Sequence, residues 1–355
     1  MTATAAPDRS ATTRVLSFHA DYGCRDRGAC CTAGWPIPIE APALAAAEHA
    51  ARSGHLQTPA HATTMFVRRH DAPLDTPALV ATSPDGRCVF HHHHGAARCE
   101  LHRALGHAAL PLACRQFPRV SVHDPRGVSI TLSHFCPTAA ELLDSTLPVG
   151  ISETSSGFPR HGEYVGLDVR TALPPALRPD MLMDWESWWM WEREAVALLA
   201  DVAEPGEGLE RLSVAVEHAR SWRPADGPLN VRIETAFRLA KGSDRPTRFT
   251  SDVLASRVDD ALAAVPDELR PGARPTPPTA SMISPRAHRN FLVAHAFANW
   301  TAHIGEGLRS WLRSVEAAHA MLVTGQSIGE ADLLLRHLAD PAALARAYSQ
   351  AERYP

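Results

Sequence analysis

The chain has 355 residues, of which 45% are apolar, so it is long enough to bury a sizeable core and to form two domains. Its 35 Lys and Arg against 39 Asp and Glu leave a net charge of −4, which argues against a nucleic-acid partner and against a polybasic membrane anchor. No apolar run approaches the roughly 18 residues of a membrane helix. Residues 1–13 lack an apolar segment, so we expect a disordered leader and a cytoplasmic, reducing compartment.

All seven cysteines lie in the first part of the chain, and none follows Cys136. Thiols that only fill a core would be scattered over the whole length, whereas thiolates that share a metal must be gathered into one fold unit. Their spacing matches neither the paired C-x2-C knuckles of a zinc ribbon nor a ferredoxin run, and an odd count excludes complete disulfide pairing. Metal ligation is therefore favoured over buried non-ligand cysteines. The candidate ligands are Cys24, Cys30, Cys31, Cys88, Cys99, Cys114 and Cys136.

Seven thiols exceed the four that one zinc ion or one cubane cluster needs. Some are therefore spare, or a second metal is present. Cys30 and Cys31 are adjacent, so their side chains diverge and would serve two metals, or one metal and the core.

The expected first domain covers residues 14–146 and combines helices with short strands. Its expected elements are a helix at 40–53, a hairpin of 79–82 with 87–90, a helix at 99–105, a hairpin of 120–122 with 128–132, and a helix opened by Pro137.

Two histidine features of this domain lead to different expectations. On the helix at 99–105, Cys99 and His102 share a face, which makes His102 a further candidate ligand; the alternative is a surface histidine that donates to a carbonyl. The run His91 to His94 is expected to form a solvated loop and not a metal site.

Five sequence blocks bring a resemblance into view. They are GCRDRGACCTAGWPIPIE (23–40), RCVF (87–90), CELHRALG (99–106), LACRQFPRV (112–120) and CPTAAELL (136–143). In this order they resemble the CxxxCC cysteine-cluster family, which is associated with zinc or iron chelation, and especially its branch containing flagellin lysine N-methylase. The resemblance implies an iron–sulfur cluster or zinc, and methyl transfer from S-adenosylmethionine to a protein with accessible lysines.

Arg115 and Arg119 lie inside the CRQFPR block and allow two interpretations. They either pair with carboxylates, or they support the thiolates by lowering their pKa and balancing their charge.

Residues 147–180 are rich in Pro, Gly, Ser and Thr and are expected to form a linker or a lid. An all-α domain is expected over 181–355. The first expected helix begins after Asp184, and further helices are expected at 209–219, 231–239 and 252–264. A pair of helices is expected over 285–323, another after a Ser327–Glu330 capping box, and a last one that Pro341 starts.

Four of the eight tryptophans lie between Trp185 and Trp191. An amphipathic helix that packs its indoles into a bundle explains them better than an aromatic cage for a methylated lysine. Trp191 falls off the main stripe and is expected to be an exposed contact.

The sequence therefore predicts a mainly α protein that binds a metal through its cysteines. Three function classes remain: a lysine N-methylase-like enzyme, an iron–sulfur redox protein, and a zinc-stapled interaction module without catalysis. No catalytic residue is assigned. No Gly-rich strand-to-helix turn is evident, so a methyl donor would have to bind against the metal site or between the domains.

Overall fold

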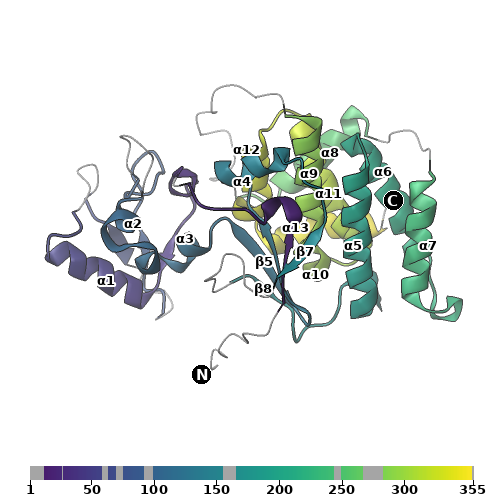
Figure 1. Ribbon diagram of the computed structural model, residues 1–355, viewed down its shortest axis with the longest axis horizontal. Coiled ribbons are helices and arrows are strands. Elements are labelled where there is room, and N and C mark those ends of the chain that lie inside the picture. The colour runs from purple at the N-terminus through teal and green to yellow at the C-terminus, as the bar shows by residue number, and fades with distance from the viewer. Residues whose placement is uncertain are drawn as a thin grey trace. The chain divides into compact units, whose positions relative to one another are not determined.

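The computed structural model describes residues 12–25, 27–57, 63–68, 75–91, 99–154, 165–243, 249–266 and 283–353. These residues are mainly α-helical, with short strands (Figure 1). They form two compact units. Unit 1 contains residues 12–22, 120–134 and 139–353, and unit 2 contains residues 23–119 and 135–138.

Unit 1 contains a five-stranded mixed sheet with the order β7-β1-β6-β5-β8 among the described residues. The first strand pairs with β6 in parallel and with β7 in antiparallel fashion, so an N-terminal segment lies between two segments that follow it by more than a hundred residues. The bounds are β1 (Thr12–Leu16), β5 (Arg119–Asp124), β6 (Gly127–Leu132), β7 (Ile151–Thr154) and β8 (Leu167–Asp168).

The hairpin predicted around residues 124–127 is confirmed as the β5–β6 connection. Gly127 has a φ of 126°, and a Cβ atom there would lie 2.3 Å from the carbonyl oxygen of Thr12. Only glycine fits this close approach between the turn and β1.

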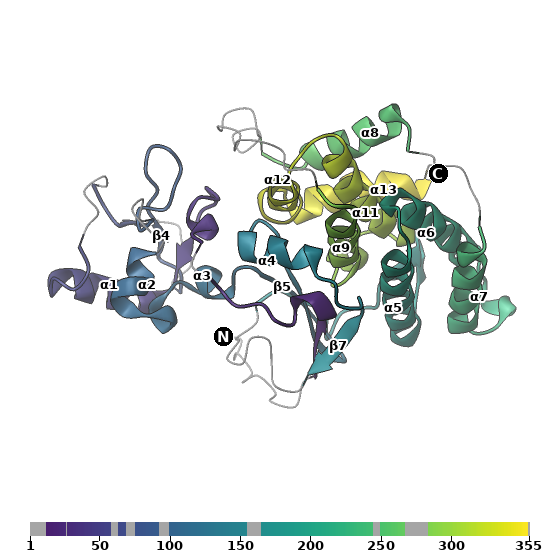
Figure 2. The same cartoon turned by 45° about the horizontal axis from the view of Figure 1, so that its top comes forward.

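Most other described elements of unit 1 are helices, and α11 packs against α6, α8, α9 and α13. Helices α5, α6 and α7 lie side by side (Figure 2). The bounds are α5 (Trp185–Asp201), α6 (Pro205–Arg220), α7 (Leu229–Lys241), α8 (Ser251–Leu262), α9 (Pro285–Ala296), α10 (Thr301–Ile304), α11 (Leu308–Val323), α12 (Ile328–Leu333) and α13 (Pro341–Arg353). Shorter elements are η1 (Ser17–His19), η4 (Leu142–Asp144), η5 (Pro224–Asp226), the π-helix η7 (Leu334–Leu338), and the hairpin of β9 (Ala176–Arg178) with β10 (Met181–Leu182).

Several helix ends follow their expected chemistry. Asp184 accepts a hydrogen bond from the backbone N–H of Ser187, and Ser327 and Glu330 form the predicted capping box. Residues 285–323 form three helices where two were expected, because α10 forms a short separate helix before Gly305 and Gly307.

The described part of 181–355, expected to be all-α, contains one short strand, β10, which pairs with β9. Residues 147–180, expected as a linker or lid, contain β7, β8 and β9, while residues 155–164 lie outside the described part. The reason is that β1 and β5 each need a neighbour on their outer edge, and β7 and β8 supply it. The expected domain boundary at residue 146 accordingly differs from the division between the two units.

The expectation that Trp191 is exposed is wrong. Its side chain is 0% exposed and packs between Phe237, with ring centroids 4.9 Å apart, and Trp311, at 5.6 Å. Helix α5 packs against α6, α7 and α9, so it buries more of its circumference than one hydrophobic stripe indicates.

Unit 2 has a small antiparallel sheet with the order β2-β4-β3 and several short helices. Its helix α1 (Ala41–Arg52) confirms the prediction, with Pro42 in its first turn and Gly54 just beyond its end. The other elements are η2 (Ala29–Cys31), β2 (Pro38–Ile39), β3 (Phe66–Arg68), β4 (Ala78–Val80), α2 (Glu100–Leu105), η3 (His107–Ala109), α3 (Leu112–Gln116) and α4 (Pro137–Glu141), which begins in unit 2 and ends in unit 1.

The hairpin expected from 79–82 and 87–90 is reduced to one antiparallel bridge between Thr82 and Cys88. The strand β4 pairs instead with β2 and β3, and Ser83 closes the turn by accepting from the N–H of Gly86.

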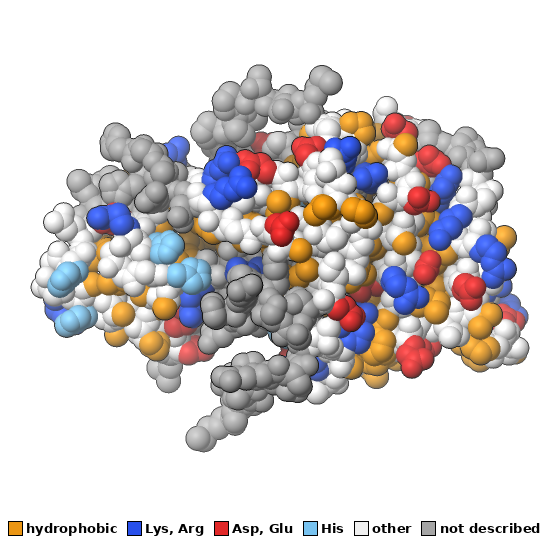
Figure 3. Space-filling model, in the orientation of Figure 1, with side chains coloured by type: hydrophobic (Ala, Val, Ile, Leu, Met, Phe, Trp, Pro, Cys, Tyr) orange, Lys and Arg blue, Asp and Glu red, His pale blue; other side chains and the backbone are white. Residues whose placement is uncertain are grey.

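Charged side chains of both signs are interspersed over the helices of unit 1 on the face shown in Figure 3. Such mixing is typical of a solvated surface. Among the described residues, no helix is both long enough and apolar enough to cross a membrane.

Candidate metal centre

All seven cysteines belong to unit 2 and are present as thiols. Cys136 joins the others because residues 135–138 return to this unit after the β5–β6 hairpin. Cysteines separated by more than a hundred residues in the sequence are thus placed in one fold unit.

Five of the cysteines lie in or against one hydrophobic core, and we call them the thiol group. Different elements place them. η2 carries two of the five and follows Gly28, which has a φ of 74°; the Gly86 turn, the start of α2 and the middle of α3 place one each. The thiol group consists of Cys30, Cys31, Cys88, Cys99 and Cys114.

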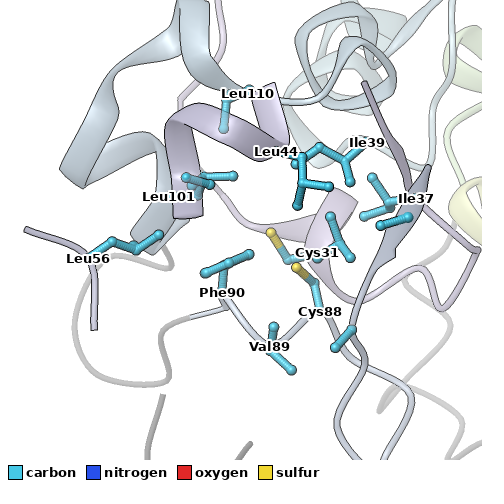
Figure 4. Close-up of a cluster of buried hydrophobic side chains, with 14 of the residues drawn as sticks. Cys31, Ile37, Ile39, Leu44, Leu56, Cys88, Val89, Phe90, Leu101 and Leu110 are labelled. Carbon is cyan, nitrogen blue, oxygen red and sulfur yellow. The ribbon is translucent and has the colours of Figure 1, made fainter. Parts of the chain in front are cut away.

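Cys31 is the centre of this group. Its thiol forms hydrogen bonds with Cys30, Cys88 and Cys99. The backbone also ties two of these residues together, because the N–H of Cys88 donates to the carbonyl oxygen of Cys31 at 2.8 Å. Figure 4 shows the sulfur atoms of Cys31 and Cys88 beside one another among aliphatic and aromatic side chains.

The single S–H proton of Cys31 is shared in these hydrogen bonds, with Cys30 and Cys99 as acceptors. The hydrogen bonds to Cys30, Cys88 and Cys99, followed by burial, raise the pKa of Cys31. The hydrogen bond from Cys31 lowers the pKa of Cys30, and it lowers that of Cys99 to about 7 with help from the backbone N–H groups of His102 and Leu101. Cys99 is therefore suited to become a thiolate near neutral pH.

Cys114 differs from its neighbours. Burial first, and then the nearby thiols and Glu40, raise its pKa well above the ordinary value. The carboxylate of Glu40 accepts a hydrogen bond from the N–H of Leu112 at 3.0 Å, which fixes it at the start of α3. A bound cation would offset this collection of like charges.

Within the described ranges, no set of three or more His, Cys, Asp or Glu side chains is disposed so that it could hold a metal ion. The thiol group supplies the ligand type and number that zinc or an iron–sulfur cluster takes. Four of its sulfur atoms, those of Cys30, Cys31, Cys88 and Cys99, are instead joined by hydrogen bonds through Cys31. The donor chemistry fits a metal, whereas their placement is that of mutually hydrogen-bonded thiols.

The remaining candidate ligands have varied environments. Cys24 is exposed and Cys136 is buried. The ring of His102 lies 5.8 Å from that of His107 between centroids, while its backbone N–H contributes a hydrogen bond to Cys99. Cys99 itself precedes α2 as its N-cap residue, and the role of His102 as a further ligand stays a prediction.

Arg119 is the first residue of β5, and its Nη1 donates back to α3, to the carbonyl oxygens of Arg115 at 2.9 Å and Gln116 at 3.1 Å. Partial burial, followed by the charges of His102, Arg119 and Arg115, lowers the pKa of His107. The two arginines therefore create a positive potential on the α2–α3 side of unit 2. Their expected support of the thiolates remains a prediction.

Trp35 brings two of the sequence blocks together. Its ring centroid lies 5.3 Å from that of Phe117 and 5.8 Å from that of Phe135. The GWPIPI and CRQFPR segments thus meet at one indole, which also contacts Phe135, the residue before the CPTAA block.

A small, partly open pocket of about 10 Å³ lies beside the thiol group. This volume is close to the minimum that holds one water molecule, and it is far too small for an adenosyl cofactor. The expectation that a methyl donor binds against the thiols finds no support in this pocket. It is lined by Cys30, Cys31, Gly34, Trp35, Ile37, Val80, Ala81, Thr82, Gly86 and Cys88.

The His91 to His94 run is described only at its first residue. His91 is buried and forms an antiparallel bridge with Cys99, so the solvated-loop prediction is wrong for this residue. The cause is the backbone of 88–91, which turns to meet the start of α2. Residues 92–94 lie outside the described part.

Sequence reasoning missed a buried polar network in unit 1, which we call the histidine cluster. The carboxylate of Asp332 is its centre: Oδ1 lies 3.1 Å from Arg336 Nε, 3.3 Å from His295 Nε2 and 3.5 Å from His134 Nδ1, and Oδ2 accepts from Ser133 at 2.6 Å. Two further histidines extend it. His19 lies 3.0 Å from His134 between Nε2 atoms, and His337 Nε2 lies 2.7 Å from Ser133 Oγ.

The cluster draws on η1, the end of β6, α9, α12 and η7, so no local motif could reveal it. The only sequence signal was the high histidine content, 20 residues in the chain.

The aromatic-cage alternative for the tryptophans loses its basis. Trp188 and Trp191 are buried, and the guanidinium of Arg126 already lies 4.7 Å above the ring of Trp189. The cation–π partner of this indole is internal.

No family model matches the chain, and no curated protein and no solved structure shows significant similarity to it.

Proposed function

We propose that unit 2 binds a metal through the thiol group, and that this metal is a zinc ion or the iron of an iron–sulfur cluster. The observation that carries the proposal is the convergence of five thiols from separate segments on one core, with Cys31 hydrogen-bonded to three of them. A core that needed only small apolar residues would gain nothing from placing sulfur beside sulfur. Thiolate ligation gives this arrangement a purpose.

The ligands would come from Cys30, Cys31, Cys88, Cys99 and Cys114. Cys30 and Cys99, whose pKa values are lowered, would give up their protons most readily, and a metal would displace the remaining proton of Cys31. A bound zinc would staple η2, the Gly86 turn, α2 and α3 together, and a bound iron–sulfur cluster would add one-electron chemistry.

The test is an anaerobic preparation of the full chain without a histidine tag, followed by metal analysis and a visible spectrum. Zinc or iron in stoichiometric amount supports the proposal, and the spectrum separates the two metals. A metal-free protein that unfolds cooperatively, with no metal taken up on titration, would overturn it.

A second candidate is lysine N-methyl transfer from S-adenosylmethionine to a protein substrate. It rests on the sequence blocks, and the observation that favours it is the meeting of two of them at Trp35. Because the pocket beside the thiols is too small for the donor, the methyl donor would bind elsewhere in the chain.

Calorimetric titration of the metal-loaded protein with S-adenosylmethionine, with mass spectrometry of lysine-rich proteins from the source cell, tests this activity. Donor binding together with added methyl mass supports it. If both effects are absent and the protein has a visible iron–sulfur spectrum, the result favours a redox protein. If both effects are absent and the protein contains zinc, the result favours an interaction module.

A further inference from the structure

We propose that Cys31 and Cys88 are a peroxide-sensitive pair that forms an intramolecular disulfide and thereby withdraws two thiols from metal binding. The disulfide itself follows from geometry alone. Its effect on metal uptake rests on the proposed function of the thiol group.

The backbone holds the two residues at disulfide distance. A hydrogen bond of 2.8 Å joins the N–H of Cys88 to the carbonyl oxygen of Cys31, which limits the Cα–Cα separation to about 6.7 Å at most. Disulfides span Cα atoms roughly 4.4–6.8 Å apart. The thiols of the two residues are hydrogen-bonded, and their sulfur atoms lie side by side in Figure 4.

The other partners of Cys31 are less suitable. Cys30 is its sequence neighbour, and a bond between adjacent cysteines closes a strained ring. The backbone of Cys99 is bridged to His91 and starts α2, so it is held by different partners from those of Cys31. Cys88 alone combines a thiol contact with a backbone hydrogen bond to Cys31.

The burial of the two thiols determines which oxidants can reach them. Cys31 and Cys88 are 6% and 8% exposed, and both line the partly open pocket of about 10 Å³. Hydrogen peroxide has only two heavy atoms and can reach the thiols through the open side of this pocket, whereas the much larger glutathione disulfide is excluded.

The reaction balances with hydrogen peroxide as the oxidant. One sulfur attacks a peroxide oxygen, the O–O bond breaks, and a sulfenic acid and one water form. The second sulfur then attacks the sulfenic sulfur, the S–O bond breaks, and a second water leaves. Each thiol gives up one proton and the pair gives up two electrons, so peroxide is reduced to two waters and the thiols become one disulfide.

The test uses the full chain, freed of metal by a chelator under anaerobic conditions. Protein is exposed to stoichiometric hydrogen peroxide, alkylated, digested without reduction, and mapped by mass spectrometry. We expect the peptides containing Cys31 and Cys88 to be the dominant linked pair, lighter by two hydrogens than the separate thiols. Predominant linkage of another pair, or sulfinic acids without any linkage, would overturn the proposal.

Two comparisons sharpen the test. Glutathione disulfide should leave the native protein unlinked, and linkage by this bulky oxidant would refute the access argument. In Cys88→Ser the linked peptide should vanish, whereas Cys24→Ser, at an exposed thiol, should retain it. The wild-type map decides the outcome even if Cys88→Ser does not fold.

The effect on metal is measured separately. After oxidation, the protein should take up far less zinc or iron than the reduced sample, and a thiol reductant should restore uptake. Equal uptake by both samples would refute the metal-withdrawal part. If the reduced protein binds no metal at all, the proposed function fails, while the peptide map still decides whether the disulfide forms.

Discussion

Unit 1 should lose stability in mild acid, and His295 of the histidine cluster allows this to be measured at one residue. Its side chain is 7% exposed, with Nε2 3.3 Å from Asp332 Oδ1. Burial, followed by the charge of Arg336, lowers its pKa from 6.5 to about 4 against the opposing effect of Asp332. The folded protein therefore keeps this imidazole neutral at a pH where the unfolded chain protonates it.

The direction and size follow from linkage. Above pH 6.5 neither the folded nor the unfolded state binds the proton, so the unfolding free energy is at its full value. It declines as the pH falls toward the folded pKa of about 4, because only the unfolded chain binds the proton in this range. From about pH 8 to about pH 5, one histidine shifted this far costs about 2 kcal/mol of unfolding free energy. His295→Gln removes the titrating group. Over this pH interval, the unfolding free energy of the variant should therefore fall by about 2 kcal/mol less than that of the wild type.

Denaturant unfolding followed by tryptophan fluorescence is the assay, because all of the eight tryptophans except Trp35 belong to unit 1. The comparison of pH dependences cancels any loss of stability that the substitution causes at every pH. His55→Gln, at an exposed histidine of unit 2, is the matched control and should follow the wild-type profile. A His295→Gln profile parallel to the wild type would show that this histidine titrates normally, and would refute the argument from burial.

Other substitutions test the core and the thiols. Cys31→Ser should lower metal content and thermal stability in the anaerobic protein, whereas Cys24→Ser should change both far less; equal effects would contradict the central role of Cys31. Trp191→Ala should lower the unfolding free energy, measured with denaturant, by about 3–5 kcal/mol, and Trp185→Ala, at a half-buried residue, should lower it clearly less. A larger loss in Trp185→Ala would show that the packing of α5 is misassigned. Ser327→Ala removes a helix cap and should cost about 1 kcal/mol, and an unchanged midpoint would argue against the capping box.

Local chemistry made several elements predictable. The bounds of α1, the start of α5 after Asp184, the capping box before α12 and the β5–β6 turn all depend on residues close in sequence. The confinement of the cysteines to the first part of the chain likewise indicated that one unit would collect them.

Long-range pairing could not be predicted in the same way. Nothing in the sequence of Thr12–Leu16 says that it pairs with residues 127–130 and 151–154. The histidine cluster has the same character, since His19, His134 and Asp332 acquire their roles only from contacts between distant segments. Burial of Trp191 depends on how many helices surround α5, which a periodicity within one helix does not contain.

The position of β1 has a consequence for synthesis of the chain. Thr12–Leu16 leaves the ribosome long before its partners β6 and β7 exist, because residues 23–119 of unit 2 are made in between. Six of the seven cysteines, up to Cys114, therefore emerge before the first strand of unit 1 has its neighbours. Only Cys136 follows β6, so the sheet closes after most of the cysteine-rich unit has been made.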